Sequence, residues 1–221
     1  MRKADREQID LWFYEKEAIA QGHRVIAGID EAGRGPLAGP VVAAAVILPF
    51  DCDIDGIFDS KQLSEKKRDI AFDKIMEIAT SIGVGIVDAG EIDRINILQA
   101  TYQAMRAAII QLTVRANLLL IDGNPIRNFG HQHMGIVKGD SKSASIAAAS
   151  IIAKVTRDRI MCEYDQVFPQ YGFAKHKGYP SEDHLKMLAL HGVSEIHRRS
   201  FGPVRDTKKE LSRNWVQTEL F

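Results

Sequence analysis

The order of secondary-structure patterns along this sequence predicts a mixed α/β fold. Three apolar, partly β-branched runs come first, and helical patterns then alternate with two further strand-like runs. Two of the strands share a form, because "RVIAGID" closes on Asp30 before Glu-Ala-Gly and "NLLLID" closes on Asp122 before Gly-Asn-Pro. If a right-handed crossover joins these strands, they lie parallel and bring the two aspartates together at their carboxyl ends.

The first half of the chain alternates between apolar runs and helical spacing. Gly and Pro bound the apolar runs, which favours strands, and the glycine-rich connection between the first two strands allows them to pair antiparallel. Ser64 is the expected N-cap of one helix, because its hydroxyl can accept from a backbone N–H of the first turn. The expected elements are a short amphipathic helix over 5–21, strands over 24–30 and 41–49, a helix over 64–80 and a strand over 81–89.

The second half begins with apolar residues at three-and-four spacing over many turns, which is typical of a long helix. A later helical stretch has an alanine-rich face that suits close packing. The expected elements are a long helix over 89–115, a strand over 117–125, a short strand over 135–140, and helices over 141–165 and 182–192, followed by a basic tail.

The composition is that of a globular protein. The chain has 221 residues, of which 45% are hydrophobic and 26% charged. Its charged start is followed by no long apolar run, so we expect neither a signal peptide nor a membrane span. Cys52 and Cys162 lack metal-ligand spacing and fit the reducing cytoplasm, which is the expected location.

The formal net charge is zero, but the charge is unevenly distributed. Residues 174–213 hold nine Lys or Arg against five Asp or Glu, together with four of the seven histidines. Such a basic end can hold a polyanion while acids elsewhere perform chemistry. A solvated helical face is the simpler interpretation of the same bias.

Two motifs suggest ligands that the surrounding residues disfavour. "GRGPLAG" is one residue off the dinucleotide fingerprint, but an acidic pair precedes it and would repel a pyrophosphate. "DCDIDGIFDSKQ" over 51–62 resembles a calcium loop, but its twelfth residue is Gln62 where a bidentate Glu is needed. An acidic surface turn is the favoured interpretation of that segment.

Four acids lie where apolar or strand-like runs break: Asp30, Glu31, Asp122 and Asp140. Ligands with oxygen donors alone suit Mg²⁺ or Mn²⁺, and two such ions can activate a water and stabilise a leaving oxygen in phosphodiester hydrolysis. The alternative is that acids at strand ends merely cap helices, as Asp140 before Ser141 can do. The pair plus two further acids, beside a glycine-rich loop, favours a metal site.

Several long motifs resemble the bacterial type 2 ribonucleases H, the ribonuclease HII family. They are "GIDEAGRGPLAGPVVAAAVIL", "DSKQLSEKKR", "LLIDGN", "KGDSKSASIAAASIIAKVTRD" and "YGFAKHKGYPSEDH", and they occur in order from about residue 24 to 203. The resemblance implies a ribonuclease H-like fold, with a five-stranded mixed sheet flanked by helices and a helical C-terminal part. It also implies cleavage of RNA in RNA–DNA hybrids and on the 5′ side of a single ribonucleotide in duplex DNA, leaving a 3′-hydroxyl and a 5′-phosphate.

Site residues follow from the same resemblance. The family's four metal-binding acids fall on the four acids named above, which implies two Mg²⁺ or Mn²⁺ ions with substrate. A 2′-hydroxyl is what separates RNA from DNA, and side-chain-free glycines let backbone groups approach it. The family's substrate-binding motif falls on Gly33, Arg34 and Gly35, and its stacking tyrosine falls on Tyr179. We also expect Lys61, Lys175 and Lys177 to contact backbone phosphates, and a solvated charge is the alternative for any single lysine.

The related ribonuclease HIII carries Glu as its fourth acid and a large N-terminal domain. Here the fourth acid is Asp140 and about 23 residues precede the first strand, so both features favour ribonuclease HII and a role in ribonucleotide excision repair. We expect one catalytic domain, with a helical extension over about 1–23, a basic helical part over about 165–213 and a tail over 214–221.

The last five residues form a separate motif. "QTELF", from Gln217 to Phe221, is similar to short peptides that bind the bacterial sliding clamp, and a free tail can act as a tether. A tail that packs on its own domain is the alternative. The residues alone also leave two other functions open, namely a non-catalytic nucleic-acid-binding module and a DNA nuclease or resolvase.

Overall fold

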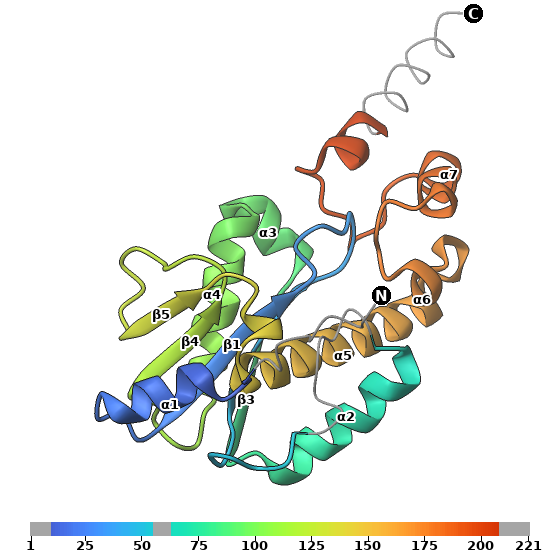
Figure 1. Ribbon diagram of the computed structural model, residues 1–221. Helices are drawn as coiled ribbons and strands as arrows, with labels where there is room; N and C mark the ends of the chain where they lie inside the picture. The colour runs from blue at the N-terminus through green and yellow to red at the C-terminus, as the bar shows by residue number, and fades with distance from the viewer. Residues whose placement is uncertain (1–9, 55–62, 208–221) are drawn as a thin grey trace, which may run out of the picture. The chain divides into compact units, whose positions relative to one another are not determined.

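The computed structural model describes residues 10–54 and 63–207 of the chain. Five strands form one mixed sheet in the order β3-β2-β1-β4-β5, with helices flanking it (Figure 1). This arrangement confirms the fold class. The strands are β1 (Ile26–Ala32), β2 (Val41–Ile47), β3 (Ser81–Val87), β4 (Leu118–Asp122) and β5 (His133–Ile136).

The helices account for most of the remaining described chain. The α-helices are α1 (Phe13–Ala20), α2 (Glu65–Ile78), α3 (Ala89–Ile95), α4 (Ile97–Ile110), α5 (Ala144–Val167), α6 (Phe173–His176) and α7 (Glu182–His191). Two 3-10 turns, η1 (Gly139–Ser141) and η2 (Pro169–Tyr171), precede α5 and α6. The helices α6 and α7 are the helical C-terminal part that the resemblance implies.

The chain divides into two compact units, each built from three segments. Unit 1 comprises 1–30, 44–83 and 110–152, and unit 2 comprises 31–43, 84–109 and 153–221. The division passes through β1, β2 and β3, and in β1 it falls between Asp30 and Glu31. The one-domain prediction is not tested by this division.

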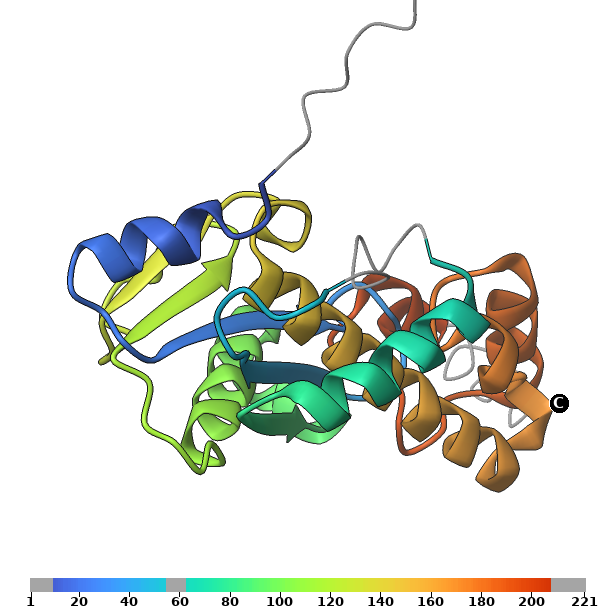
Figure 2. The same ribbon diagram turned by 60° about the horizontal axis from the view of Figure 1, so that its bottom comes forward.

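Unit 1 contains β4, β5 and the part of β1 up to Asp30, and these strands run parallel. β4 pairs with β1 on one side and β5 on the other, and all four of its leucine and isoleucine residues are buried. A strand covered on both faces reads as a continuous apolar run, which is why "LLLI" lacks alternation. The helix α1 lies along this part of the sheet (Figure 2), and its Ala18 packs with Leu120, Ile136 and Ile146.

Unit 2 has two small apolar clusters. Phe173 of α6 packs with Tyr171 and with Met161 of α5, and Leu188 of α7 packs with Leu37 and Val204. Leu37 also donates its N–H to Gly178 O at 2.8 Å, so the loop after β1 is joined to the segment between α6 and α7.

Most of the expected elements are present, and several boundaries are confirmed. β1 and β4 are parallel as predicted, with Ile29 opposite Ile121. Ser64 is the N-cap of α2, and its Oγ accepts from Lys67 N at 3.4 Å. The part of the expected N-terminal helix over 5–9 lies outside the described residues, and α1 begins only at Phe13, because Asp10 to Trp12 form a turn in which Asp10 accepts from Trp12 N.

Two predicted elements were wrong in extent. The long helix over 89–115 is two helices, because Asn96 adopts φ 69° and its side chain accepts from Leu98 N and Gln99 N to start α4. The short strand over 135–140 ends at Ile136, since Lys138 is left-handed and the 3-10 turn η1 follows. Asp140 therefore lies in a turn and not at a strand end.

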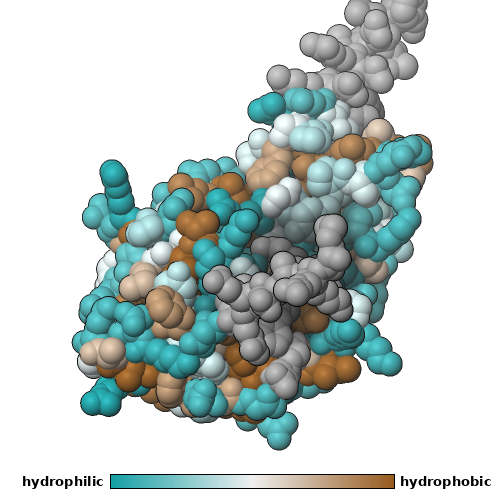
Figure 3. All heavy atoms as spheres, in the orientation of Figure 1, coloured by the Kyte–Doolittle hydropathy of each residue, from teal (hydrophilic) through white to brown (hydrophobic). Residues whose placement is uncertain are grey.

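Hydrophilic residues cover most of the face shown in Figure 3, with smaller hydrophobic groups between them. Within the described ranges, no helix is both long enough and apolar enough to cross a bilayer.

Candidate active site

Asp30 and Asp122 occupy matching positions on neighbouring parallel strands. Ile29 lies opposite Ile121, so the next residue on each strand is one of the two aspartates. Asp30 is only 4% exposed, and it follows the buried run of β1. The register therefore brings two carboxylates to the carboxyl end of the sheet, where open α/β sheets bind ligands.

Asp140 is placed by a turn that contacts Asp122. Gly139 N donates to Asp122 Oδ1 at 2.6 Å, and Asp140 is the next residue, 5% exposed. The turn packs closely here, because a Cβ on Gly139 would lie 2.6 Å from Ile146 Cδ1 and 3.4 Å from Asp122 Oδ1. A strand continuing through Asp140 would not bring the backbone back toward Asp122, so the turn gives Asp140 its position.

Glu31, the fourth acid, follows Asp30 within β1. Because successive side chains of a strand alternate, Glu31 starts from the opposite face to Asp30. Its Oε1 accepts from Arg34 Nη1 at 3.1 Å, which ties the acid to the loop that follows β1.

The four acids fit a hard divalent cation by their chemistry. All their side-chain donors are oxygens, as Mg²⁺ and Mn²⁺ prefer, and buried carboxylates such as Asp30 and Asp140 are costly unless they are paired or bind metal. In the part of the chain that the structure describes, no group of three or more His, Cys, Asp or Glu side chains is arranged as a metal-binding cluster.

The loop after β1 has a backbone that only glycine allows at Gly33. This residue has φ 96°, and a Cβ on it would lie 2.1 Å from Arg157 Nε and 2.7 Å from Pro40 O. The loop is thus packed directly against a buried arginine. Glycine is needed at position 33 because the Arg157 side chain lies directly against the loop backbone there.

Two fully buried arginines, Arg157 and Arg198, bind the carbonyls of this loop. Arg198 donates to Gly33 O at 2.6 Å, Arg34 O at 3.0 Å, Gly39 O at 3.0 Å and Pro40 O at 3.1 Å. Each of these bonds is charge-assisted and so stronger than a bond between neutral groups.

Arg157 donates to Pro40 O at 2.9 Å, Ala38 O at 3.1 Å and Lys177 O at 2.9 Å. Burial lowers the pKa of Arg157 to about 10, and burial with the neighbouring Arg157 charge lowers the pKa of Arg198 to about 9. Both values lie well above neutral pH, so both side chains are charged there.

Tyr179 lies beside the same loop with its ring partly exposed. Its relative exposure is 43%, and a Cβ on Gly35 would be 3.7 Å from Tyr179 Cε1. The Arg157 guanidinium carbon lies 5.9 Å from the ring centroid. Gly35 and Tyr179, 144 positions apart by number, are therefore neighbours, as a shared substrate surface requires.

A histidine cluster supports the Tyr179 segment. His184 Nδ1 is 2.8 Å from Tyr179 O, and His184 Nε2 is 3.0 Å from His197 Nε2. His176 stacks on His184 with ring centroids 4.4 Å apart. Burial lowers the pKa of His184, and burial with the nearby His184 and His176 lowers the pKa of His197 to about 3. His197 is neutral at pH 7 and serves packing and hydrogen bonding.

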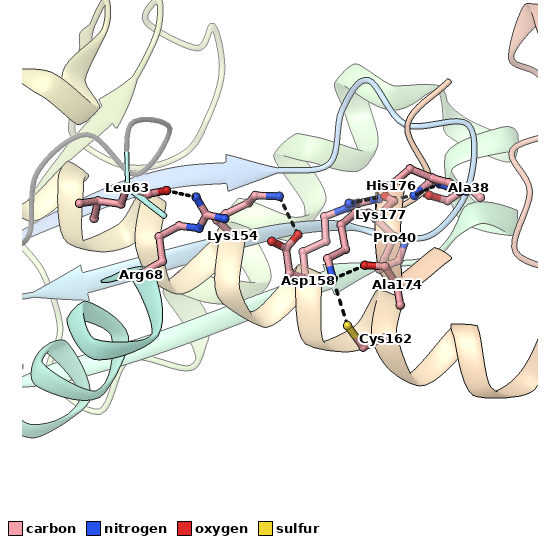
Figure 4. Close-up of polar contacts among 12 residues, drawn as sticks. Ala38, Pro40, Leu63, Arg68, Lys154, Asp158, Cys162, Ala174, His176 and Lys177 are labelled. Carbon is pink, nitrogen blue, oxygen red and sulfur yellow. Dashed lines mark hydrogen bonds and ion pairs between the residues drawn. The ribbon is translucent and has the colours of Figure 1, made fainter. Parts of the chain in front are cut away.

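The three lysines expected at phosphates differ in their surroundings. Lys61 lies outside the described residues. Lys175 is exposed and pairs with Asp183 at 2.6 Å. Lys177 points into the protein, where its Nζ donates to Ala174 O at 2.7 Å and Cys162 Sγ at 3.0 Å (Figure 4). The phosphate roles of these lysines stay predictions.

Sequence reasoning missed Arg157, Arg198 and the histidine cluster. The sequence did contain a signal for Arg157. It lies four residues after Ala153 and four residues before Met161, so it shares a helix face with buried apolar residues. A charged residue on such a face needs buried partners. No comparable pattern marks Arg198.

Comparison with known proteins gives four concordant matches. A family model described as Ribonuclease HII matches residues 27–204. A ribonuclease HII of Geobacter sulfurreducens is 57% identical over 89% of this chain and 90% of that protein. The crystal structure of ribonuclease H2 from Pyrococcus horikoshii OT3 has a TM-score of 0.72 and 28% identity, covering 86% of this chain and 99% of that one. A PCNA:RNase HII complex from Archaeoglobus fulgidus has a TM-score of 0.68 and 27% identity, covering 81% of this chain and 96% of that one.

Proposed function

This chain belongs to the ribonuclease HII family of metal-dependent endonucleases acting on RNA in RNA–DNA hybrids, and we propose that it also cuts duplex DNA 5′ of a single embedded ribonucleotide. The products would be a 3′-hydroxyl and a 5′-phosphate. The observation that carries this proposal is the register of β1 and β4, which aligns Asp30 with Asp122 beside the turn of Asp140.

In this proposal Asp30, Glu31, Asp122 and Asp140 hold two divalent cations, Mg²⁺ or Mn²⁺. Such ions supply an activated water and charge stabilisation for the leaving oxygen when bound. The acids serve as ligands and not as nucleophiles. Burial of Asp30 and Asp140 supports this role, because a low-dielectric setting strengthens attraction to a cation.

The sugar beside the scissile phosphate is read by the loop of Gly33, Arg34 and Gly35 together with Tyr179. The 2′-hydroxyl can donate and accept, so backbone groups at a glycine-lined surface can distinguish it from a hydrogen atom. Arg34 is about half exposed and can contact a phosphate. The exposed ring of Tyr179 offers a flat surface against a deoxyribose or ribose.

The test uses one end-labelled DNA duplex with a single internal ribonucleotide, beside an all-DNA duplex of the same sequence. Each is incubated with Mg²⁺, with Mn²⁺ and with chelator. We expect a metal-dependent cut immediately 5′ of the ribonucleotide and none in the all-DNA duplex. Cleavage of the all-DNA duplex would indicate a DNA nuclease. Binding without cleavage in either metal would indicate a binding module.

The proposal extends to the repair role, the location and the partner of the protein. Cutting at lone ribonucleotides would begin ribonucleotide excision repair, in the cytoplasm where bacterial DNA lies, by a single catalytic domain. The Archaeoglobus fulgidus relative was solved in complex with PCNA, which supports a clamp partner here. The expected contact, Gln217 to Phe221, lies outside the described residues. Removal of 217–221 should abolish retention in a clamp pull-down if this tail is the tether.

A further inference from the structure

We propose that Arg198 is a positioning residue for ribonucleotide discrimination, because it fixes the direction of the backbone N–H groups of Arg34 and Gly35. This inference rests on the proposed reading of the 2′-hydroxyl by the loop after β1. Arg198 itself is fully buried and does not touch substrate.

The argument starts from peptide geometry. In a planar trans peptide the C=O of one residue and the N–H of the next point in opposite directions, and every described peptide bond here is trans. Gly33 O accepts from Arg198 Nη2, so the N–H of Arg34 points away from the buried guanidinium. Arg34 O accepts from Arg198 Nη1, so the N–H of Gly35 also points away. Two successive donors are thereby turned outward from the core.

The other end of the loop is bound by the same side chain. Arg198 Nε donates to Gly39 O, and Nη2 also donates to Pro40 O, which Arg157 Nε shares. A planar guanidinium can reach both ends of the loop because its donors are spread over a rigid fork. A lysine ammonium has its donors at one point and cannot hold the two ends together.

The backbone that follows Arg198 is bound by a residue of α3. Asp93 of α3 accepts from Arg199 N at 2.7 Å, and from Ser200 N at 2.9 Å and Ser200 Oγ at 2.6 Å. These bonds fix the backbone directly after Arg198. The backbone of Arg198 also joins the loop directly, because Arg198 N donates to Leu37 O at 2.8 Å. Its side chain therefore starts from a backbone position that is fixed both by α3 and by the loop.

The experiment measures binding in an Asp122→Asn background, in which we expect no cleavage. The dissociation constants of the single-ribonucleotide duplex and the all-DNA duplex are determined, and their ratio is the preference. We expect Arg198→Lys to lower this preference about tenfold, the effect of losing about one hydrogen bond to a charged group. The matched control is Arg199→Lys, an exposed neighbour whose replacement should leave the preference unchanged.

A purely structural role would lower the melting temperature of Arg198→Lys without changing the preference of the folded protein, and that result would overturn the proposal. If Arg198→Lys does not fold, Asp93→Asn replaces it, since this change loosens the backbone after Arg198 while keeping one acceptor. We then expect a smaller fall in preference, and an unchanged preference would again overturn the proposal.

Failure of the proposed function would look different. In that case the Asp122→Asn protein with Arg198 intact would itself show no preference for the ribonucleotide duplex. If the Asp122→Asn protein prefers the ribonucleotide duplex and its Arg198→Lys derivative shows the same preference, the Arg198 proposal is wrong and the proposed function still stands.

Discussion

Asp122 in unit 1 and the Gly33–Gly35 loop in unit 2 are held in place by different kinds of contact. Asp122 is placed by strand pairing, with Ile136 opposite it on β5 and the Gly139 N–H on its carboxylate. The loop has only an isolated antiparallel bridge, between Ala38 and His197, and the side chains of Arg157 and Arg198 bind its carbonyls as well. Asp122 therefore depends mainly on strand pairing, and the loop depends mainly on a few buried side chains.

This difference suggests that the two regions respond differently to substitution. Changing an acid should remove chemistry and leave the sheet intact, because backbone pairing does not involve the carboxylate. Changing the supports of the loop should alter selectivity and local stability while the acids stay in place. The following predictions test this separation, beginning with the largest expected effect.

Asp122→Asn should abolish cleavage while leaving the protein folded. Loss of a ligand charge removes several kcal/mol of transition-state stabilisation, so we expect a fall of about 10³-fold or more. The new amide oxygen can still accept from Gly139 N, so the urea midpoint should change little. Exposed Asp183→Asn is the control and should retain activity. Unfolding of Asp122→Asn would show that the carboxylate is structural, and this would break the comparison.

Tyr179→Ala should weaken cleavage at a lone ribonucleotide more than cleavage of a long hybrid. Stacking on an aromatic ring contributes about 1–3 kcal/mol, so the expected rise in KM for the lone site is about 5- to 150-fold. Tyr179→Phe keeps the ring and should behave nearly as the parent protein. Steady-state kinetics on both substrates decide this, and an equal loss on both would argue against a junction-reading role.

Acid should destabilise the histidine cluster. The pKa of His197 is lowered to about 3 by burial and by His184 and His176, whereas an unfolded histidine has a pKa of about 6.5. The unfolded chain therefore binds more protons below pH 6.5, so the free energy of unfolding falls as pH drops from 6.5 toward 3. We expect a loss of about 2 kcal/mol between pH 7 and pH 5 from this residue.

Urea unfolding at the two pH values measures this loss. His197→Gln should reduce the pH dependence, and His131→Gln, an exposed histidine of unit 1, should leave it unchanged. An identical pH dependence in all three proteins would contradict the assignment to His197.

Lys175→Ala should have the smallest effect. Its exposed ammonium can contact phosphate without reading the sugar, so binding of ribonucleotide and all-DNA duplexes should weaken equally. The slope of log K against log salt should decrease by about 1. A change in the ratio of the two affinities would assign Lys175 to the sugar-reading group instead.

The two regions also differed in how far the sequence predicted them. The pairing of Asp30 with Asp122 follows from apolar runs that end on aspartate, which is a local pattern. Arg198 binds carbonyls up to 165 positions away. Every residue has a backbone carbonyl, so no sequence pattern marks the ones that Arg198 binds. The break at Asn96 and the turn before Asp140 were missed for a related reason, since a left-handed residue and a close backbone contact override helical or strand spacing.

The division of each unit into three chain segments has a consequence for biosynthesis. Val25, beside the start of β1, bonds Asn117, 92 positions later, so the β4 side of β1 stays unpaired until β4 has been made. At ribosomal rates of about 5–20 residues per second this delay is roughly 5–20 s. During that time β1 has an open edge on its β4 side, a state in which nascent chains are prone to associate. Chaperone dependence during translation, and slow recovery after dilution from denaturant, are therefore expected of this topology.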